Sequence, residues 1–153
     1  MKFWIGVASQ EHVKIGEKGG FCQLCHGKSA PLKRMKKGDF IIYYSSKKQM
    51  LDKLPYQMFT AIGQMRDDVV YQVEMFEGFF PYRKDVGFFE CLEYPIVPLI
   101  AELSFIQNKK QWGYPFRFGH LEINEKDFLL IASQMLNENI LNQIKENINA
   151  NRR

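Results

Sequence analysis

The sequence predicts an α+β fold, a curved β-sheet or small barrel with short helices packed around it and a helix near the C-terminus. Three observations predict it. Apolar segments rich in β-branched and aromatic residues dominate the middle of the chain, at 40–46, 56–65 and 69–75. Helical patterns flank these segments without the regular alternation of strand and helix that a parallel sheet requires. The clearest helical periodicity follows Asn124.

The N-terminal part is expected to hold one strand and two short helices. Residues 2–8 (KFWIGVA) are apolar and partly β-branched, which indicates a strand. Ser9 is a typical N-cap for a helix that ends at the following pair of glycines. After the loop GGFCQLCHGK, a second short helix runs through APLKRM and has Pro31 in its first turn.

The rest of the chain is expected to form most of the sheet and then the terminal helices. A turn at 66–68 separates the strands at 56–65 and 69–75, and residues 79–95 form an extended segment broken by Pro81. Residues 96–106 predict a short helix, and 114–123 alternate as a strand. Asn124 caps the helix that follows, and apolar spacing resumes as a second helix after Asn137.

The length of 153 residues suits one domain. With 46% hydrophobic and 25% charged residues, the composition is that of an ordinary globular protein. We expect a single domain over residues 1–148 and a disordered tail over 149–153. No apolar run is long enough to span a bilayer, and the N-terminal stretch is too short for a signal peptide. A cytoplasmic protein without a membrane partner is therefore expected.

The charge is distributed unevenly. Residues 1–50 hold ten Lys or Arg against three Asp or Glu, a net charge of +7, whereas residues 51–153 hold eleven against fourteen, a net charge of −3. A basic half is compatible with a polyanionic partner, but from the charge alone a solvated lysine surface is the favoured interpretation.

The stretch FCQLCHGK (21–28) contains a C-x-x-C-H motif, which is shared by haem, zinc and redox sites. Covalent haem attachment would need export, and structural zinc would need four ligands from a small remaining set: Cys91, His12, His26 and His120. A redox dithiol would open a helix after a strand, which this loop does not do. We therefore expect Cys22 and Cys25 to shape the loop, with no metal and no cofactor.

Four segments, in this order, resemble the EVE domain: FWIGVAS, APLKRMKKGDFIIYYSS, FTAIGQM and WGYPFRFGHLEI. The resemblance covers about residues 2–136 and is most specific at 33–45 and 112–119. It implies a PUA-like pseudo-barrel related to YTH domains. It also implies a pocket that holds a modified base, flipped from DNA or taken from single-stranded RNA, against aromatic side chains.

The resemblance places this pocket at the loop that begins near Phe21. The stacking tryptophan of YTH relatives is not at that position, so Phe21 and Tyr82 are the expected aromatic walls. Ser9 is either a helix cap or a pocket residue, and Trp112 either packs in the core or contacts the ligand. The complete expected pocket is Ser9, Phe21, Cys22, Gln23, His26, Tyr82, Arg83 and Trp112. If Tyr82 belongs to the core, the surroundings of Trp112 and Arg117 are the next place to look.

The expected function is a nucleic-acid-binding module that recognises a modified base in DNA or RNA. Contacts to the phosphate backbone are assigned to Lys28, Lys33, Arg34, Lys36 and Lys37. No nucleophile elbow, phosphate-binding glycine loop or carboxylate cluster favours an enzyme. An RNA- or nucleotide-processing enzyme is the alternative, because related PUA-like folds include such enzymes.

Overall fold

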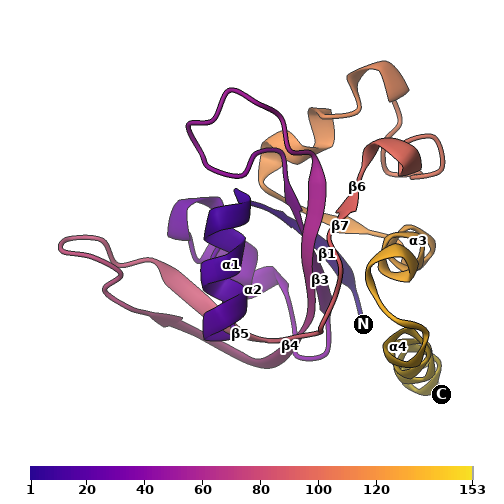
Figure 1. Ribbon diagram of the computed structural model, residues 1–153. Coiled ribbons are helices and arrows are strands. Elements are labelled where there is room, and N and C mark those ends of the chain that lie inside the picture. Colours follow the sequence, from indigo (N-terminus) through magenta and orange to yellow (C-terminus); the bar gives the residue numbers. More distant parts are fainter. Residues whose placement is uncertain (153) are drawn as a thin grey trace.

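The computed structural model describes residues 1–152, and within them one curved, open sheet carries helices on both faces (Figure 1). The strands are β1 (Phe3–Val7), β2 (Phe21–Cys22), β3 (Phe40–Ser45), β4 (Met58–Gln72), β5 (Tyr82–Phe88), β6 (Tyr94–Pro95) and β7 (His120–Ile123). The α-helices are α1 (Gln10–Gly19), α2 (Ala30–Arg34), α3 (Glu125–Met135) and α4 (Glu138–Asn151). Four 3-10 turns complete the chain: η1 (Cys25–Gly27), η2 (Val97–Leu99), η3 (Lys109–Gln111) and η4 (Tyr114–Phe118).

The strand order is β2-β5-β4-β3-β1-β7, and β6 pairs with β4. Only β1 and β3 run parallel among the described pairs, and the other neighbours are antiparallel. The crossover between β1 and β3 contains α1, β2 and α2, as a parallel connection requires a long crossover. The predicted α+β class, with a curved sheet, flanking helices and a C-terminal helix, is confirmed.

The sheet separates two apolar cores. Phe3, Phe40 and Phe128 pack between the sheet and the pair α3 and α4. Trp4 and Leu32 belong to the second core, which lies between the sheet and the pair α1 and α2. Because successive side chains of a strand point to opposite faces, β1 and β3 supply both cores, and β3 is buried along its whole length.

Four expected elements were wrong. The turn at 66–68 is a bulge within the continuous strand β4, where the register shifts between Met65 and Val70. Residues 96–106, expected as a helix, contain only the short 3-10 turn η2. Residues 114–118, expected as part of a strand, form η4, because Pro115 lies in the first turn of a 3-10 helix that Gly119 ends at a φ of 75°. Helix α4 continues to Asn151, so residues 149–151 are helical instead of a disordered tail, and Arg153 lies outside the described residues.

Two buried polar side chains hold α2 and the turn after it against the sheet. The ammonium of Lys84, a fully buried group of β5, donates to the carbonyl oxygens of Leu32 and Met35 at the end of α2. The carboxylate of Asp39 accepts from the Trp4 indole at 3.0 Å and from the Lys36 amide at 2.9 Å. These bonds hold α2 and the turn that follows it, as far as Asp39, in place on the sheet.

Candidate nucleic-acid interface

A cavity of about 520 Å³ lies beyond the C-terminal end of β1. Its walls come from the first turn of α1, the loop around η1, the connection between β4 and β5, and η4. Met50, from the loop between β3 and β4, completes the lining. The volume lies within the range of small-molecule binding sites, roughly 300–1,000 Å³.

Gln23 is the most firmly held polar group of the cavity. Its carbonyl Oε1 accepts a bond of 3.1 Å from Arg83 Nε, and its Nε2 lies 3.7 Å from Met75 Sδ. Its backbone amide donates to the Tyr43 hydroxyl at 3.4 Å. Because an amide side chain offers both donors and an acceptor, Gln23 presents a fixed hydrogen-bonding edge to the cavity.

Two further polar groups come from the start of α1. Ser9 Oγ accepts the backbone amide of His12 at 3.3 Å, so Ser9 is both the helix cap and a cavity residue. Its hydroxyl proton is still free to donate into the cavity. The pKa of His12 is lowered by burial, by Arg83 and by His26, so its imidazole is neutral at pH 7 and offers one donor and one acceptor.

The apolar part of the cavity is aromatic and sulfur-rich. Phe76 and Phe79 lie at the tip of the β4–β5 connection with ring centroids 4.9 Å apart and tilted by 31°. Phe116 of η4 lines the cavity and stacks on Tyr44 at 4.2 Å. Met50 and Met75 add flexible thioether contacts. Arg117 also lines the cavity, and the central carbon of its guanidinium lies 5.7 Å from the ring centroid of Tyr114.

Of the expected pocket residues, Ser9, Gln23 and His26 line the cavity, and Arg83 acts on it through Gln23. The placement of Phe21 as an aromatic wall was wrong. Only 9% of Phe21 is exposed, the guanidinium of Arg83 covers its ring, and Gly16 and Gly19 of α1 adjoin it. No face of this ring is free for a base.

Cys22, Tyr82 and Trp112 also lie outside the cavity lining. Cys22 is fully buried in the core beside α1 and α2, and this burial raises its pKa to about 12. Tyr82 packs against the same core. Trp112 packs against the other core, with its ring edge toward Tyr44 at 6.5 Å between centroids. Of the two alternatives for Trp112, core packing is the one found.

The sequence did contain signals for the missed residues. In Phe76-Glu77-Gly78-Phe79, a glycine at a φ of 83° closes a tight turn, and the amide of Phe79 donates to the carbonyl of Phe76 at 2.9 Å. Such a turn presents both phenylalanines at one tip. His12 lies three residues after the cap Ser9, so both side chains belong to the first helical turn.

The C-x-x-C-H motif shapes the loop around η1. Cys25, His26 and Gly27 adopt positive φ values of 50°, 61° and 81°, which is costly for the first two residues. Gly27 also lies so close to Pro81 that a Cβ atom would meet it at 2.5 Å. Cys25 Sγ lies 3.8 Å from the carbonyl of Phe118. The loop around η1, with this strained backbone, therefore lies between η4 and the β4–β5 connection, beside the cavity.

Within residues 1–152, no group of three or more His, Cys, Asp or Glu side chains is arranged to hold a metal ion. The three cysteines are free thiols.

The residues expected to contact phosphates are all exposed, and they are together called the basic surface: Lys28, Lys33, Arg34, Lys36 and Lys37. Lys28 directly follows η1, which contains the cavity residues Cys25 and His26, and the others lie on α2 and the turn that leads to β3. Lys84 and Asp39 anchor this segment through its backbone, so the cationic side chains stay in solvent.

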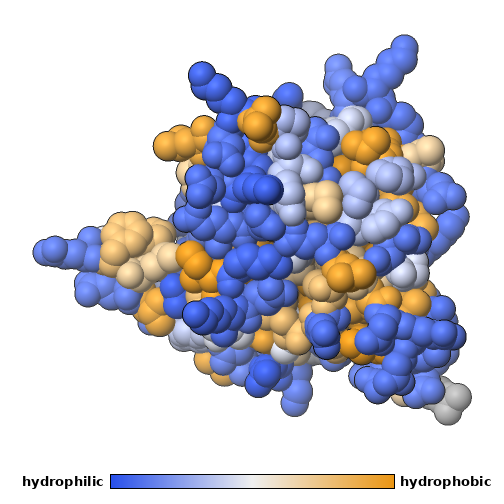
Figure 2. All heavy atoms as spheres, viewed as in Figure 1, coloured by the Kyte–Doolittle hydropathy of each residue, from blue (hydrophilic) through white to orange (hydrophobic). Residues whose placement is uncertain are grey.

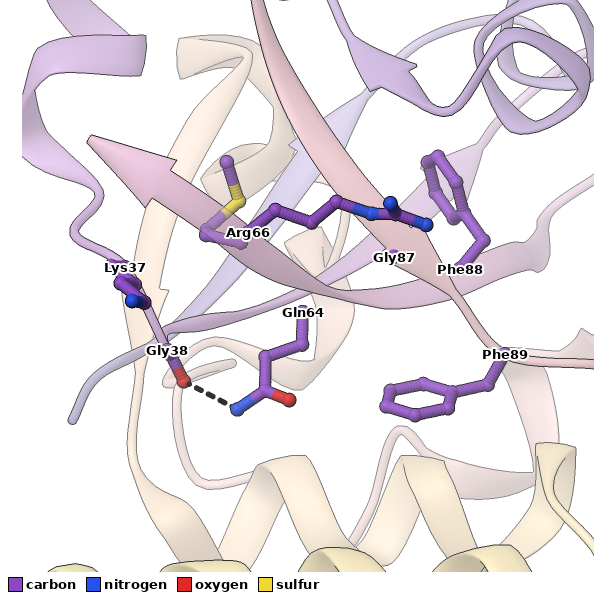
Figure 3. Close-up of a pocket in the computed structure, with 8 residues that line it drawn as sticks. Lys37, Gly38, Gln64, Arg66, Gly87, Phe88 and Phe89 are labelled. Atoms are coloured by element: carbon purple, nitrogen blue, oxygen red, sulfur yellow. Dashed lines mark hydrogen bonds between the residues drawn. The ribbon is translucent and has the colours of Figure 1, made fainter. Parts of the chain in front are cut away.

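A second hollow of about 420 Å³ adjoins the basic surface at Lys37 (Figure 3). Gln64 donates to the carbonyl of Gly38 at 3.0 Å, and the side chain of Arg66 extends over Gly87 toward Phe88. This hollow lies along β4 and β5, and its lining includes none of the expected pocket residues.

An open curved sheet with helices on both faces places the chain in the EVE/PUA-like fold class. A solved protein of Rhodopseudomonas palustris has the same fold, with a TM-score of 0.55, 12% identity and coverage of 88% of this chain and 92% of its own. A crystal structure from Agrobacterium tumefaciens gives a TM-score of 0.54 at 12% identity, with 87% and 92% covered. At these identities the likeness concerns the fold alone.

The family model of the EVE domain matches residues 2–134, and the chain belongs to the EVE domain family. A UPF0310 protein encoded in the gntR 5′ region of Bacillus licheniformis is 58% identical over 128 residues, which cover 84% of this chain and 87% of the relative. A UPF0310 protein of Streptococcus gordonii is 49% identical over 135 residues, covering 88% and 93%. These names state no activity. Among the described helices, none is long and apolar enough to cross a membrane.

Proposed function

We propose that the protein is a nucleic-acid-binding module that holds a modified base in the cavity beyond β1. The observation that carries the proposal is the convergence of aromatic rings, fixed hydrogen-bonding groups and nearby cations at one cavity. The EVE family membership supports it, because the fold is consistent with nucleic-acid binding.

The aromatic groups and the hydrogen-bonding groups of the cavity contribute to base recognition in different ways. Phe76 and Phe79 offer aromatic surface, and stacking on such rings contributes about 1–3 kcal/mol per base. Gln23 and the neutral His12 supply donors and acceptors for a base edge. A base edge that pairs with both is discriminated from one that leaves either group unpaired.

The thioethers suit a small apolar modification. Met50 and Met75 line the cavity, and a methyl group buried against them gains about 0.8 kcal/mol. This preference is modest. High affinity therefore also needs the phosphate contacts of the basic surface.

A binding panel tests the proposal. Oligonucleotides with different modified cytosines and adenines, together with unmodified controls, are titrated as DNA and RNA by fluorescence anisotropy. We expect one modified base to bind more tightly than its unmodified control. Phe79→Ala should weaken that binding by about 1–3 kcal/mol.

Tyr82→Ala is the matched control, because Tyr82 lies on β5 just beyond Pro81 but outside the cavity. It should leave the discrimination unchanged. Equal losses in both variants, or no preference for any modified base, would contradict the proposal.

The competing hypothesis of an RNA- or nucleotide-processing enzyme makes a different prediction. Mass spectrometry of the same oligonucleotides after prolonged incubation should show them intact if the protein only binds. A cleaved or altered product would favour the enzyme.

A further inference from the structure

The loop between β3 and β4, residues 46–57, exposes large apolar side chains to solvent. Met50, Leu51 and Leu54 are 72%, 92% and 79% exposed. Figure 2 shows apolar atoms on this projecting loop, which is identified in the same view in Figure 1. Single exposed apolar residues are common, but a group of three on one loop beside a cavity points to an interaction.

Hydrogen bonds hold the loop in shape. The carbonyls of Lys47 and Lys48 accept the amides of Gln10 and Glu11, in the first turn of α1, at 3.0 and 2.9 Å. Inside the loop, the Asp52 carboxylate accepts the amide of Gln49 at 3.1 Å. The apolar side chains are therefore displayed by an ordered turn.

The far end of the loop is fixed to the same helix. The Tyr56 hydroxyl bonds to the Glu93 carboxylate, which also accepts from Gln10 at 3.0 Å and pairs with Lys14 at 3.1 Å. Helix α1 carries the cavity residues Ser9 and His12 in its first turn. Helix α1 therefore anchors both the loop of residues 46–57 and one wall of the cavity.

The apolar tip adjoins the cavity. Met50 lines the cavity itself, and Leu51 follows it directly in the chain. The same loop carries the exposed cations Lys48 and Lys53, whereas the ammonium of Lys47 donates to the carbonyl of Asp52 within the loop. Side chains that enter a base stack are apolar, such as Leu and Met, and they are accompanied by cations for the flanking phosphates.

We propose that the loop of residues 46–57 is a wedge, with Leu51 and Leu54 entering the base stack of a duplex while the extruded base occupies the cavity. This rests on the proposed function and names its substrate as double-stranded nucleic acid. Extruding a base costs a few kcal/mol of stacking and pairing, and an apolar side chain that fills the gap offsets part of that cost.

The test compares the double variant Leu51→Ser/Leu54→Ser with Leu92→Ser. Leu92 is also strongly exposed, at 75%, and its segment does not line the cavity, so it is the matched control. The probes are DNA oligonucleotides with each modified cytosine and adenine of the panel, as single strands and as duplexes. Each duplex carries 2-aminopurine beside the modified base, since its fluorescence rises when the stack opens.

We expect the double variant to lose at least about tenfold in duplex affinity, and to lose the fluorescence rise. Its single-strand affinity should stay within about twofold of the original protein, and Leu92→Ser should change neither. Unchanged duplex binding, or equal losses for duplex and single strand, overturns the wedge.

Other outcomes separate this inference from the proposed function. If the unaltered protein distinguishes modified bases only in single strands, the cavity function stands and the wedge is wrong. If it distinguishes none in either form, the proposed function fails and the wedge with it. If the double variant changes only self-association in analytical ultracentrifugation, the loop is a contact between copies, which also overturns the wedge.

Discussion

The guanidinium of Arg83 lies over the ring of Phe21, with 3.8 Å between its central carbon and the ring centroid. Its Nε donates at the same time to the side chain of Gln23 at 3.1 Å. The antiparallel pairing of β2 with β5, in which Phe21 faces Asp85 and Cys22 faces Lys84, brings Gln23 opposite Arg83. Arg83 is therefore a positioning residue that covers one expected stacking ring and orients a cavity amide.

Arg83→Lys should weaken binding of the preferred modified oligonucleotide by about 1–3 kcal/mol, measured by anisotropy. The charge is kept, but the planar Nε donor to Gln23 and the flat cover over Phe21 are removed. Arg66→Lys is the control, because the exposed Arg66 lies on the bulge of β4, outside the cavity. If Arg83→Lys binds as tightly as the original protein, only the charge matters and the orienting role is wrong.

The basic surface should determine the salt dependence of binding. In Lys33→Gln/Lys36→Gln, the removal of each phosphate-binding cation should lower the slope of log K against log salt by roughly 0.7 to 0.9. Lys126→Gln/Lys145→Gln removes the same charge from exposed positions on α3 and α4, on the other face of the sheet (Figure 1), and should leave the slope nearly unchanged. Equal slopes for the two variants would make the basic surface an ordinary solvated face.

His120 should make the fold sensitive to acid. Its buried ring stacks on Trp4 at 4.7 Å between centroids, and neither ring nitrogen has a partner among the described residues. Burial, with a smaller effect of Arg34, lowers its pKa from 6.5 to about 4. The unfolded chain therefore takes up the proton first, and stability present above pH 6.5 is lost as the pH falls toward 4.

The loss from this group should reach about 3 kcal/mol in the free energy of unfolding by urea between pH 7 and pH 4. His120→Phe keeps the aromatic stack and should flatten that part of the pH dependence. His26→Gln, which changes an exposed histidine, should keep it. The same acid sensitivity in all three proteins would assign it to other groups.

The two motif cysteines should respond differently to serine. Cys22→Ser places a hydroxyl in a fully buried apolar site and should cost about 1–3 kcal/mol of stability, whereas the half-buried Cys25 should tolerate the change. Cys22→Ala is the control for volume without polarity. Elemental analysis of protein purified without chelator should find less than one zinc per chain. Stoichiometric zinc, with unfolding by chelator, would contradict this account.

Local signals determined the helix starts and the core strands from sequence. Ser9 and Asn124 were expected as caps, and they accept amides of the first helical turn at 3.3 and 2.8 Å. A cap bonds to an amide only a few residues away, so its signal lies within a short stretch of sequence. The same holds for the strand of residues 40–45, whose apolar run is long enough to predict burial on both faces.

The tertiary structure decided which aromatic rings are free. Phe21 is covered by Arg83, which is distant in the chain, and Phe79 is left at the cavity because a tight turn carries it to the tip of the β4–β5 connection. Both belong to similar turn-rich, aromatic segments, so composition could not distinguish them. Exposure of a ring depends on the partner that packs against it, and that partner is brought near only by strand pairing between distant parts of the chain.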